Sequence, residues 1–228
     1  LIYTGSFMKE YQILLNGETI TYQLTYKYMK NIRMRVKDGM LFVSAPYGTP
    51  LEYIEKTIQT YQKRLLKQIN AYQPYAQYCD HGYVLIFNQR YRIVLRDIGI
   101  KKCQFHHQDI YVYHRDIQTC IEKMCRQILH DYIEEKIIAY LAYDFDLDMP
   151  LIEIKKYKSR WGSCYYRDHR VSFHLGLIHL EKELIDYVIL HELVHFLQPN
   201  HSALFYQEIA QRMPCYKEIQ KRLKEKHT

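Results

Sequence analysis

A long apolar stripe between Ile117 and Leu141 is the feature that most constrains the fold of this chain. Its apolar residues recur at steps of three and four, at Ile117, Ile121, Met124, Cys125, Ile128, Tyr132, Ile133, Ile137 and Leu141. Such steps place side chains on one face of an α-helix. No Pro or Gly interrupts the segment. The pattern therefore predicts a helix that spans a whole domain.

Short segments with the alternation of β-strands precede this helix. Strands are expected at residues 11–15, 20–26, 33–36, 40–43, 83–87, 91–95 and 110–113. Asn16-Gly17 and Asp38-Gly39 are typical of hairpin turns between the first two pairs. After Pro50, apolar residues at helical spacing predict one helix over residues 51–69, which packs on the small sheet. The N-terminal half is thus expected to be β-rich with one helix.

The segment after the long helix mixes both kinds of element. Strands are expected at residues 151–157 and 170–173, and helices at residues 181–196, 202–212 and 216–226. The pattern changes near Asp116, which predicts an α+β fold with an N-terminal region over residues 8–115 and a second domain over residues 116–228. Residues 1–7 are set apart as an upstream extension, because Leu1 is not a methionine and a well-patterned segment begins after Met8.

Composition narrows the class of protein. A chain of 228 residues can bury a core without disulfides or a structural metal. Its six cysteines form no CxxC pair, which favours reduced thiols and a cytoplasmic protein. No segment approaches the roughly 18 apolar residues of a membrane span, and the N-terminus lacks the pattern of a signal peptide. We expect no membrane association.

The net charge of +7 leaves one class of partner open. A basic protein suits an anionic partner, but the Lys and Arg residues are scattered along the chain rather than gathered in a block. Nucleic-acid binding therefore stays an alternative and does not become the leading interpretation.

The pentapeptide from His191 to His195 carries the strongest chemical signal. Its two histidines are four residues apart on a predicted helix, so both imidazoles can bind one metal ion. Glu192 lies between them, about 100° around the helix from His191, where its carboxylate can take a proton from a water molecule without binding the metal. A zinc ion lowers the pKa of a bound water to about 7. The other interpretation is a pair of core histidines that are satisfied by local hydrogen bonds.

A zinc site of this kind needs a third protein ligand and an open position for water. His201 follows His195 by six residues across Pro199-Asn200, where Pro ends a helix and Asn tolerates a left-handed conformation. This HExxHxxxxxH spacing resembles that of the metzincins, except that Gln198 stands where they have Gly. Glu208, on the next predicted helix, is the rival third ligand.

Other candidates lie near the predicted site. Residues 158–164 contain the chain's only Trp together with a Gly and an Arg, which suggests a tight turn. Gly162 can adopt a positive φ there or allow another segment to approach its backbone closely. Arg160 binds a substrate carboxylate, orients a catalytic group, or pairs with an acid at the edge of the core. Tyr157 and Tyr206 are candidate donors to the oxyanion of a transition state. These three are possible substrate or transition-state contacts.

Two segments together resemble one known family. SRWGSC at residues 159–164 and IDYVILHELVHFLQPNHSALFY at residues 185–206 are similar to the YgjP-like zinc metallopeptidases, and more distantly to SprT-like proteases. The resemblance implies a zincin-type core: a small sheet, the long helix as its backing, and the HExxH helix. It also implies His201 as the third ligand, while His174 stands where the family usually has Asn. An extended substrate is then expected to pair with an edge strand, for which residues 151–157 are the candidate.

The leading hypothesis is a cytoplasmic zinc metallopeptidase with one Zn²⁺ ion, in which Glu192 activates water to hydrolyse a peptide or protein substrate. One alternative is a module that binds nucleic acid or protein, with a vestigial or regulatory metal site. Another is hydrolysis of a non-peptide amide, because the metal and base set the chemistry while the pocket selects the substrate.

Overall fold

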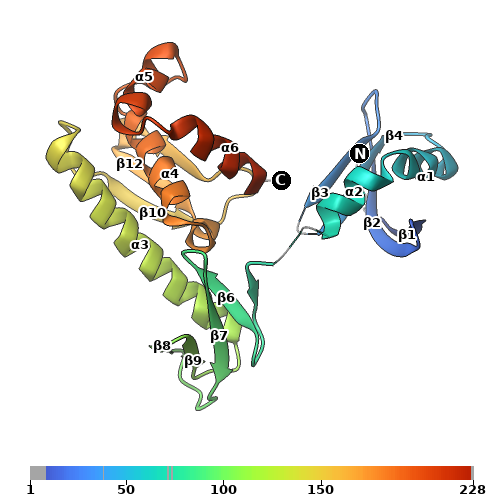
Figure 1. The fold of residues 1–228 in the computed structure, drawn as a ribbon, viewed down its shortest axis with the longest axis horizontal. Helices are drawn as coiled ribbons and strands as arrows, with labels where there is room; N and C mark the ends of the chain where they lie inside the picture. Colours follow the sequence, from blue (N-terminus) through green and yellow to red (C-terminus); the bar gives the residue numbers. More distant parts are fainter. Residues whose placement is uncertain (1–8, 38, 71, 73, 227–228) are drawn as a thin grey trace, which may run out of the picture. The chain divides into compact units, whose positions relative to one another are not determined.

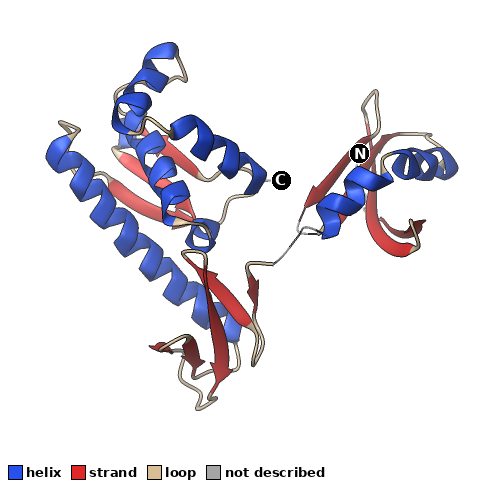
Figure 2. Cartoon of the chain, viewed as in Figure 1, coloured by secondary structure: helices blue, strands red, loops and turns tan. Residues whose placement is uncertain are grey.

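The chain folds into two compact units, and each has its own core. The computed structural model describes residues 9–37, 39–70, 72 and 74–226 (Figure 1). The expected extension at residues 1–7 and Asp38 of the predicted turn lie outside the described residues. The N-terminal unit ends at Pro74, and the C-terminal unit begins at Tyr75. Helices and strands are mixed in both units, which confirms the α+β class (Figure 2).

The N-terminal unit is a four-stranded sheet packed against two helices. Its strands lie in the order β1-β2-β4-β3, with bounds β1 Lys9–Leu15, β2 Glu18–Lys27, β3 Arg33–Lys37 and β4 Met40–Pro46. β2 and β4 pair in parallel, whereas the other two pairs are antiparallel. Apolar residues of both helices pack on the inner face of the sheet to form the core.

The expected helix over residues 51–69 is two helices, α1 (Leu51–Thr60) and α2 (Gln62–Asn70). Tyr61 leaves the helical conformation, with φ −101° and ψ 11°, so the hydrogen-bond ladder stops there. Apolar spacing cannot reveal such a break, because the steps of three and four continue through it.

The C-terminal unit is organised along the predicted long helix, α3 (Ile117–Tyr143). Asp116 caps this helix by accepting a hydrogen bond from the backbone N–H of Thr119. A five-stranded sheet lies along one part of α3 in the order β5-β6-β7-β9-β8. Its bounds are β5 Ala76–Gln77, β6 Tyr83–Ile86, β7 Gln89–Leu95, β8 Cys103–His106 and β9 Asp109–Val112.

A second, three-stranded sheet in this unit has the order β10-β12-β11, with bounds β10 Leu151–Lys155, β11 Gly162–Tyr165 and β12 Arg170–His174. β10 pairs with β12 in parallel and contacts α3, whereas β11 is antiparallel to β12 and contacts α4. The remaining helices are two 3₁₀ helices, η1 (Tyr166–Asp168) and η2 (Leu175–His179), and the α-helices α4 (Lys182–Val194), α5 (Ala203–Arg212) and α6 (Tyr216–Lys226). Gly162 begins β11 and does not have a positive φ, so of the two expectations for this residue the close backbone approach is the one that the structure supports.

The division between the units lies at residues 74 and 75 and not at the expected boundary after residue 115. Val84, Ile93 and Ile110 of the five-stranded sheet share one core with Ile117 and Ile121 of α3. The sequence pattern near Asp116 marks a change from strands to helix, which is a change of element within a single core.

The described helices also bear on the membrane question. None of those in the described ranges is both long and apolar enough to cross a membrane.

Candidate metal centre

α4 carries the first two histidines and is buried on nearly every side. Apolar side chains such as Ile185, Val188 and Ile189 are at most 4% exposed, and Glu192 is buried among them. A helix that is apolar all round must lie inside a core. The polar residues on α4 therefore have fixed surroundings, which a catalytic or metal site requires.

The chain turns after α4 and brings His201 back towards the helix. The N–H groups of Phe196 and Gln198 donate to the carbonyls of Leu193 and Val194, which tightens the last turn. Ser202 then caps α5 by accepting a hydrogen bond from the N–H of Phe205. Asn200 is not among the described residues with positive φ, so the expected left-handed conformation there is wrong.

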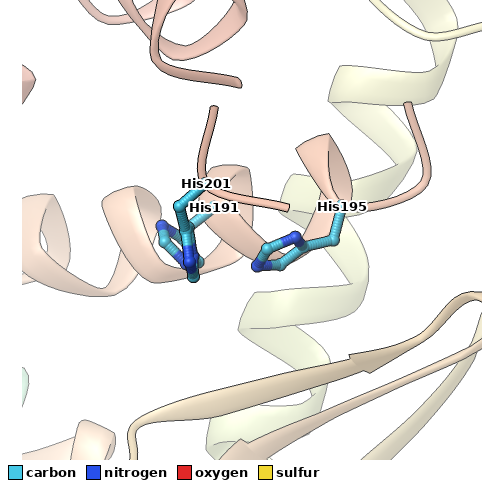
Figure 3. A group of neighbouring side chains, drawn as sticks. All are labelled: His191, His195 and His201. Carbon is cyan, nitrogen blue, oxygen red and sulfur yellow. The ribbon is translucent and has the colours of Figure 1, made fainter. Parts of the chain in front are cut away.

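The three histidines meet at one point (Figure 3). The Nε2 atoms of His191 and His201 lie 3.0 Å apart, and one nitrogen of each of the three rings lies within 4.8 Å of the others. Two ligands of a tetrahedral zinc ion at normal Zn–N lengths lie about 3.3 Å apart. The spacing of the donor atoms fits a single ion of this size.

The outer contacts of His195 suit a metal ligand as well. Its Nδ1 lies 3.2 Å from the carbonyl oxygen of Gln198. Because a carbonyl only accepts hydrogen bonds, Nδ1 carries the proton and Nε2 keeps a free lone pair. The buried Nδ1 of His191, by contrast, has no hydrogen-bond partner among the described residues.

The surroundings of His191 and His195 favour the neutral form of both rings. Burial lowers the pKa of His191 to about 3, and the neighbouring His195 and His201 add to this. Burial also lowers the pKa of His195, although its hydrogen bond to Gln198 opposes the shift. Metal binding needs unprotonated imidazoles. The electrostatics of the group therefore fit a metal ion as well as the distances do.

Phe205 supports all three rings from one side. Its ring centroid lies 4.8 Å from that of His191, 4.7 Å from that of His195 and 4.8 Å from that of His201, and its side chain is fully buried. Sequence reasoning missed this residue. The signal that could have identified it is its position four residues after His201, at the start of α5.

Glu192 lies beside the histidines in a nearly closed space and is 5% exposed. Burial raises the pKa of its carboxyl to about 8, against the opposing effects of a hydrogen bond from the Cys164 backbone and the charge of Arg160. A Cβ atom on Gly162 would lie 2.5 Å from Oε1 of Glu192. Only Gly lets β11 approach this carboxylate so closely.

The rival ligand lies in a different environment. Glu208 pairs with Arg212 at 2.6 Å, one turn further along α5. Among the described residues, it is not part of the group that His191, His195 and His201 form.

The other candidates lie at different distances from this group. Arg160 is exposed and lines a pocket with His191 and Glu192, and no ion pair of the described residues involves it. The hydroxyl of Tyr157 shares a hydrogen bond with that of Ser172. The ring of Tyr206 stacks on that of His201.

Two further histidines serve the fold. The Nδ1 of His174 accepts a hydrogen bond from the N–H of Gly176, so its Nε2 donates to the carbonyl of Tyr157. This ties η2 to the segment after β10. His179 is bonded through Nδ1 to the carbonyl oxygen of Leu85, and burial lowers its pKa. Cys164 is an unreactive thiol, because burial raises its pKa to about 12.

Replacing Glu192 with Gln is expected to stabilise the metal-free protein more at pH 8 than at pH 4.5. Because the carboxyl pKa rises from 4.5 to about 8 on folding, the folded state retains a proton that the unfolded state releases in this window. The parent therefore loses stability as the pH rises through the window, and the Gln variant is spared that loss. Urea unfolding of both proteins at the two pH values measures the difference, and a pH-independent difference would contradict the raised pKa.

Comparisons with known proteins identify the family of this chain. The model of the YgjP-like metallopeptidase domain matches residues 30–226, which include all three histidines and Glu192. No match to a curated protein is found. The crystal structure of the metallopeptidase zymogen abylysin of Pyrococcus abyssi is 24% identical over 43% of this chain and 93% of that chain, with a TM-score of 0.37. Because the family model matches well over half of the sequence, the chain belongs to the YgjP-like family and carries its metallopeptidase domain.

Proposed function

We propose that this metallopeptidase is a zinc enzyme in which His191, His195 and His201 hold one ion and Glu192 is the general base. The observation that carries the proposal is the meeting of three imidazoles beside a buried carboxylate. α4 contacts both β11 and α3, which supports the zincin-type core that the family resemblance implies. The peptidase activity itself follows from membership of the family.

The donor set favours zinc over other common metals. Three neutral imidazoles suit a borderline ion such as Zn²⁺, whereas Mg²⁺ and Ca²⁺ prefer oxygen ligands. Three protein ligands also leave a fourth position for water or substrate. When bound, the ion would supply Lewis-acid chemistry, by polarising the peptide carbonyl and acidifying a water molecule.

Glu192 moves the protons in the proposed reaction. Its carboxylate takes a proton from the attacking water and then donates it to the nitrogen of the departing amine. A general acid and base works best when its pKa lies near the working pH. In the metal-free protein burial raises the pKa of Glu192 to about 8, and the charge of a bound zinc ion would lower it from there. The N–H of Cys164 holds the carboxylate in position.

The strand that borders the site is β11, and it replaces residues 151–157 as our candidate for pairing with substrate. β10 lies at the opposite edge of the sheet and contacts α3, whereas Gly162 of β11 touches Glu192. β11 has a strand partner on one side only within the described sheet. An extended peptide that adds to its other edge passes beside Glu192.

The three possible substrate contacts receive different support. Arg160 borders the pocket that contains Glu192, which supports a contact with substrate. The hydroxyl of Tyr157 is engaged with Ser172, and the ring of Tyr206 stacks on His201, so their surroundings favour supporting roles. Nucleic-acid binding stays a prediction that rests on the net charge of +7.

Replacing His201 with Ala is expected to weaken zinc binding, while replacing Glu208 with Ala leaves it unchanged. The loss of a direct ligand costs more than the roughly 10–100-fold in affinity that follows the loss of an outer-shell partner. Chelator competition and elemental analysis of the purified variants measure this. If Glu208→Ala lost zinc while His201→Ala retained it fully, Glu208 would be the third ligand in place of His201.

The Glu192→Gln variant is expected to bind zinc and to cleave peptides roughly 10²–10⁴-fold more slowly than the parent, which is the usual contribution of general acid–base catalysis. The amide keeps the size of the side chain but cannot take up the proton. Cleavage of a mixed peptide library by zinc-loaded protein, with folding checked by circular dichroism, is the measurement. Equal rates would remove Glu192 from the mechanism.

Gly162→Ala is expected to lower kcat by up to roughly 100-fold, the cost of a reacting group displaced by about 1 Å. The added methyl group would lie 2.5 Å from Oε1 of Glu192, which is buried and has little room to move. Zinc content should stay at the parent level. Ser163→Ala, on the same strand, is the matched control; an equal loss in both variants would mean general damage to β11.

A further inference from the structure

A pocket of about 260 Å³ opens beside Glu192, within the C-terminal unit. Three elements form its walls: the segment that leads into β11, one side of α4, and the last two turns of α6. Both His191 and Glu192 line it. The volume is below the roughly 300–1,000 Å³ of sites that enclose a whole small ligand. It suits one side chain of a longer substrate.

The wall contributed by α6 is held firmly against α4. Arg222 pairs with Glu181 and Glu183 at the start of α4, and the side-chain amide of Gln220 donates to the hydroxyl of Tyr187 at 3.0 Å. Ile219 and Leu223 of α6 are buried in the core of the unit. The C-terminal helix is therefore a fixed part of the pocket.

The interior and the rim of the pocket differ in character. Trp161, Val188 and Leu223 give it apolar walls. Arg160 and Lys224 also line it, and both are exposed. Among the described residues, neither forms an ion pair, and Glu192 is the only acidic side chain of the lining. Two exposed cations that form no ion pair, next to an apolar hollow, suit a ligand with an apolar group and an adjacent carboxylate.

We propose that this pocket selects peptides with an apolar side chain next to the scissile bond, and that Lys224 and Arg160 bind a carboxylate on the residue that follows. The carboxylate is either the C-terminus of a short peptide or the side chain of Asp or Glu. Lys224 is thus a specificity-determining residue on a helix that contributes none of the proposed metal ligands. The inference rests on the proposed function for the position of the scissile bond.

The test uses four fluorescent peptides that share one sequence up to an apolar Leu and differ only after it. The first ends in Leu-Ala with a free C-terminal carboxylate. The other three have an amidated C-terminus and end in Leu-Ala, Leu-Glu or Leu-Gln. Binding is measured by anisotropy to zinc-loaded full-length Glu192→Gln protein, which retains the pocket. At least one peptide with a carboxylate should bind with about tenfold or higher affinity than the two neutral peptides, because a hydrogen bond between charged groups contributes at least this much. The peptide that gains affinity identifies the source of the carboxylate.

Charge reversal separates the pocket from general electrostatics. Lys224→Glu in the same background should abolish the preference for the carboxylate. Lys221 lies on the same helix but outside the lining of the pocket, so Lys221→Glu makes the same change in net charge and should leave the preference for the carboxylate unchanged. Equal affinity for all four peptides, or an equal effect of the two reversals, would overturn the inference.

Cleavage assays with the parent distinguish this inference from the proposed function. If the parent cleaves none of the peptides while Lys224 still governs binding, the proposed function fails and the pocket assignment stands. If the parent cleaves all four at equal rates and Lys224→Glu does not alter those rates or the binding, the proposed function stands and the pocket assignment fails.

Discussion

The burial of α4 is the constraint on which the rest of the site depends. The helix is surrounded by the three-stranded sheet, α3, α5 and α6, so almost every side chain on it has a fixed neighbour. Two imidazoles and a carboxylate in such a place are costly unless they have partners. His201, Phe205 and the backbone of β11 provide those partners, and each is positioned by an element that packs on α4. The chemistry and the packing of this unit are therefore parts of a single arrangement.

The sequence predicted much of this unit because its signals are local. The apolar stripe of α3 continues without interruption over more than twenty residues, and the four-residue spacing of His191 and His195 needs only one helix to bring the rings together. His201 could be proposed as the third ligand because it follows His195 by only six residues across a turn. In each case the geometry follows from a few bonds of chain, so the pattern of residues is enough to predict it.

Contacts between distant segments were not predictable in this way. The approach of Gly162 to Glu192 joins residues thirty positions apart, and nothing near either residue indicates it. Gly162 left two interpretations open, because a lone Gly has the same signature in a turn and in a strand that passes close to another chain segment. The boundary between the units was misplaced for a related reason. Residues 75–115 belong with α3 through shared burial, which the order of strands and helices does not encode.

The close contact at Gly162 has a consequence for how related sequences are compared. A HExxH pentapeptide arises readily by chance, so it says little on its own about whether a protein keeps a working site. In this fold the carboxylate needs a strand position that lacks a side chain, and that position lies far away in the sequence. The two features arise independently, because no local pattern links them. A chain that has the pentapeptide but a larger residue at the position of Gly162 has kept the proposed metal ligands and lost the space that the proposed base occupies.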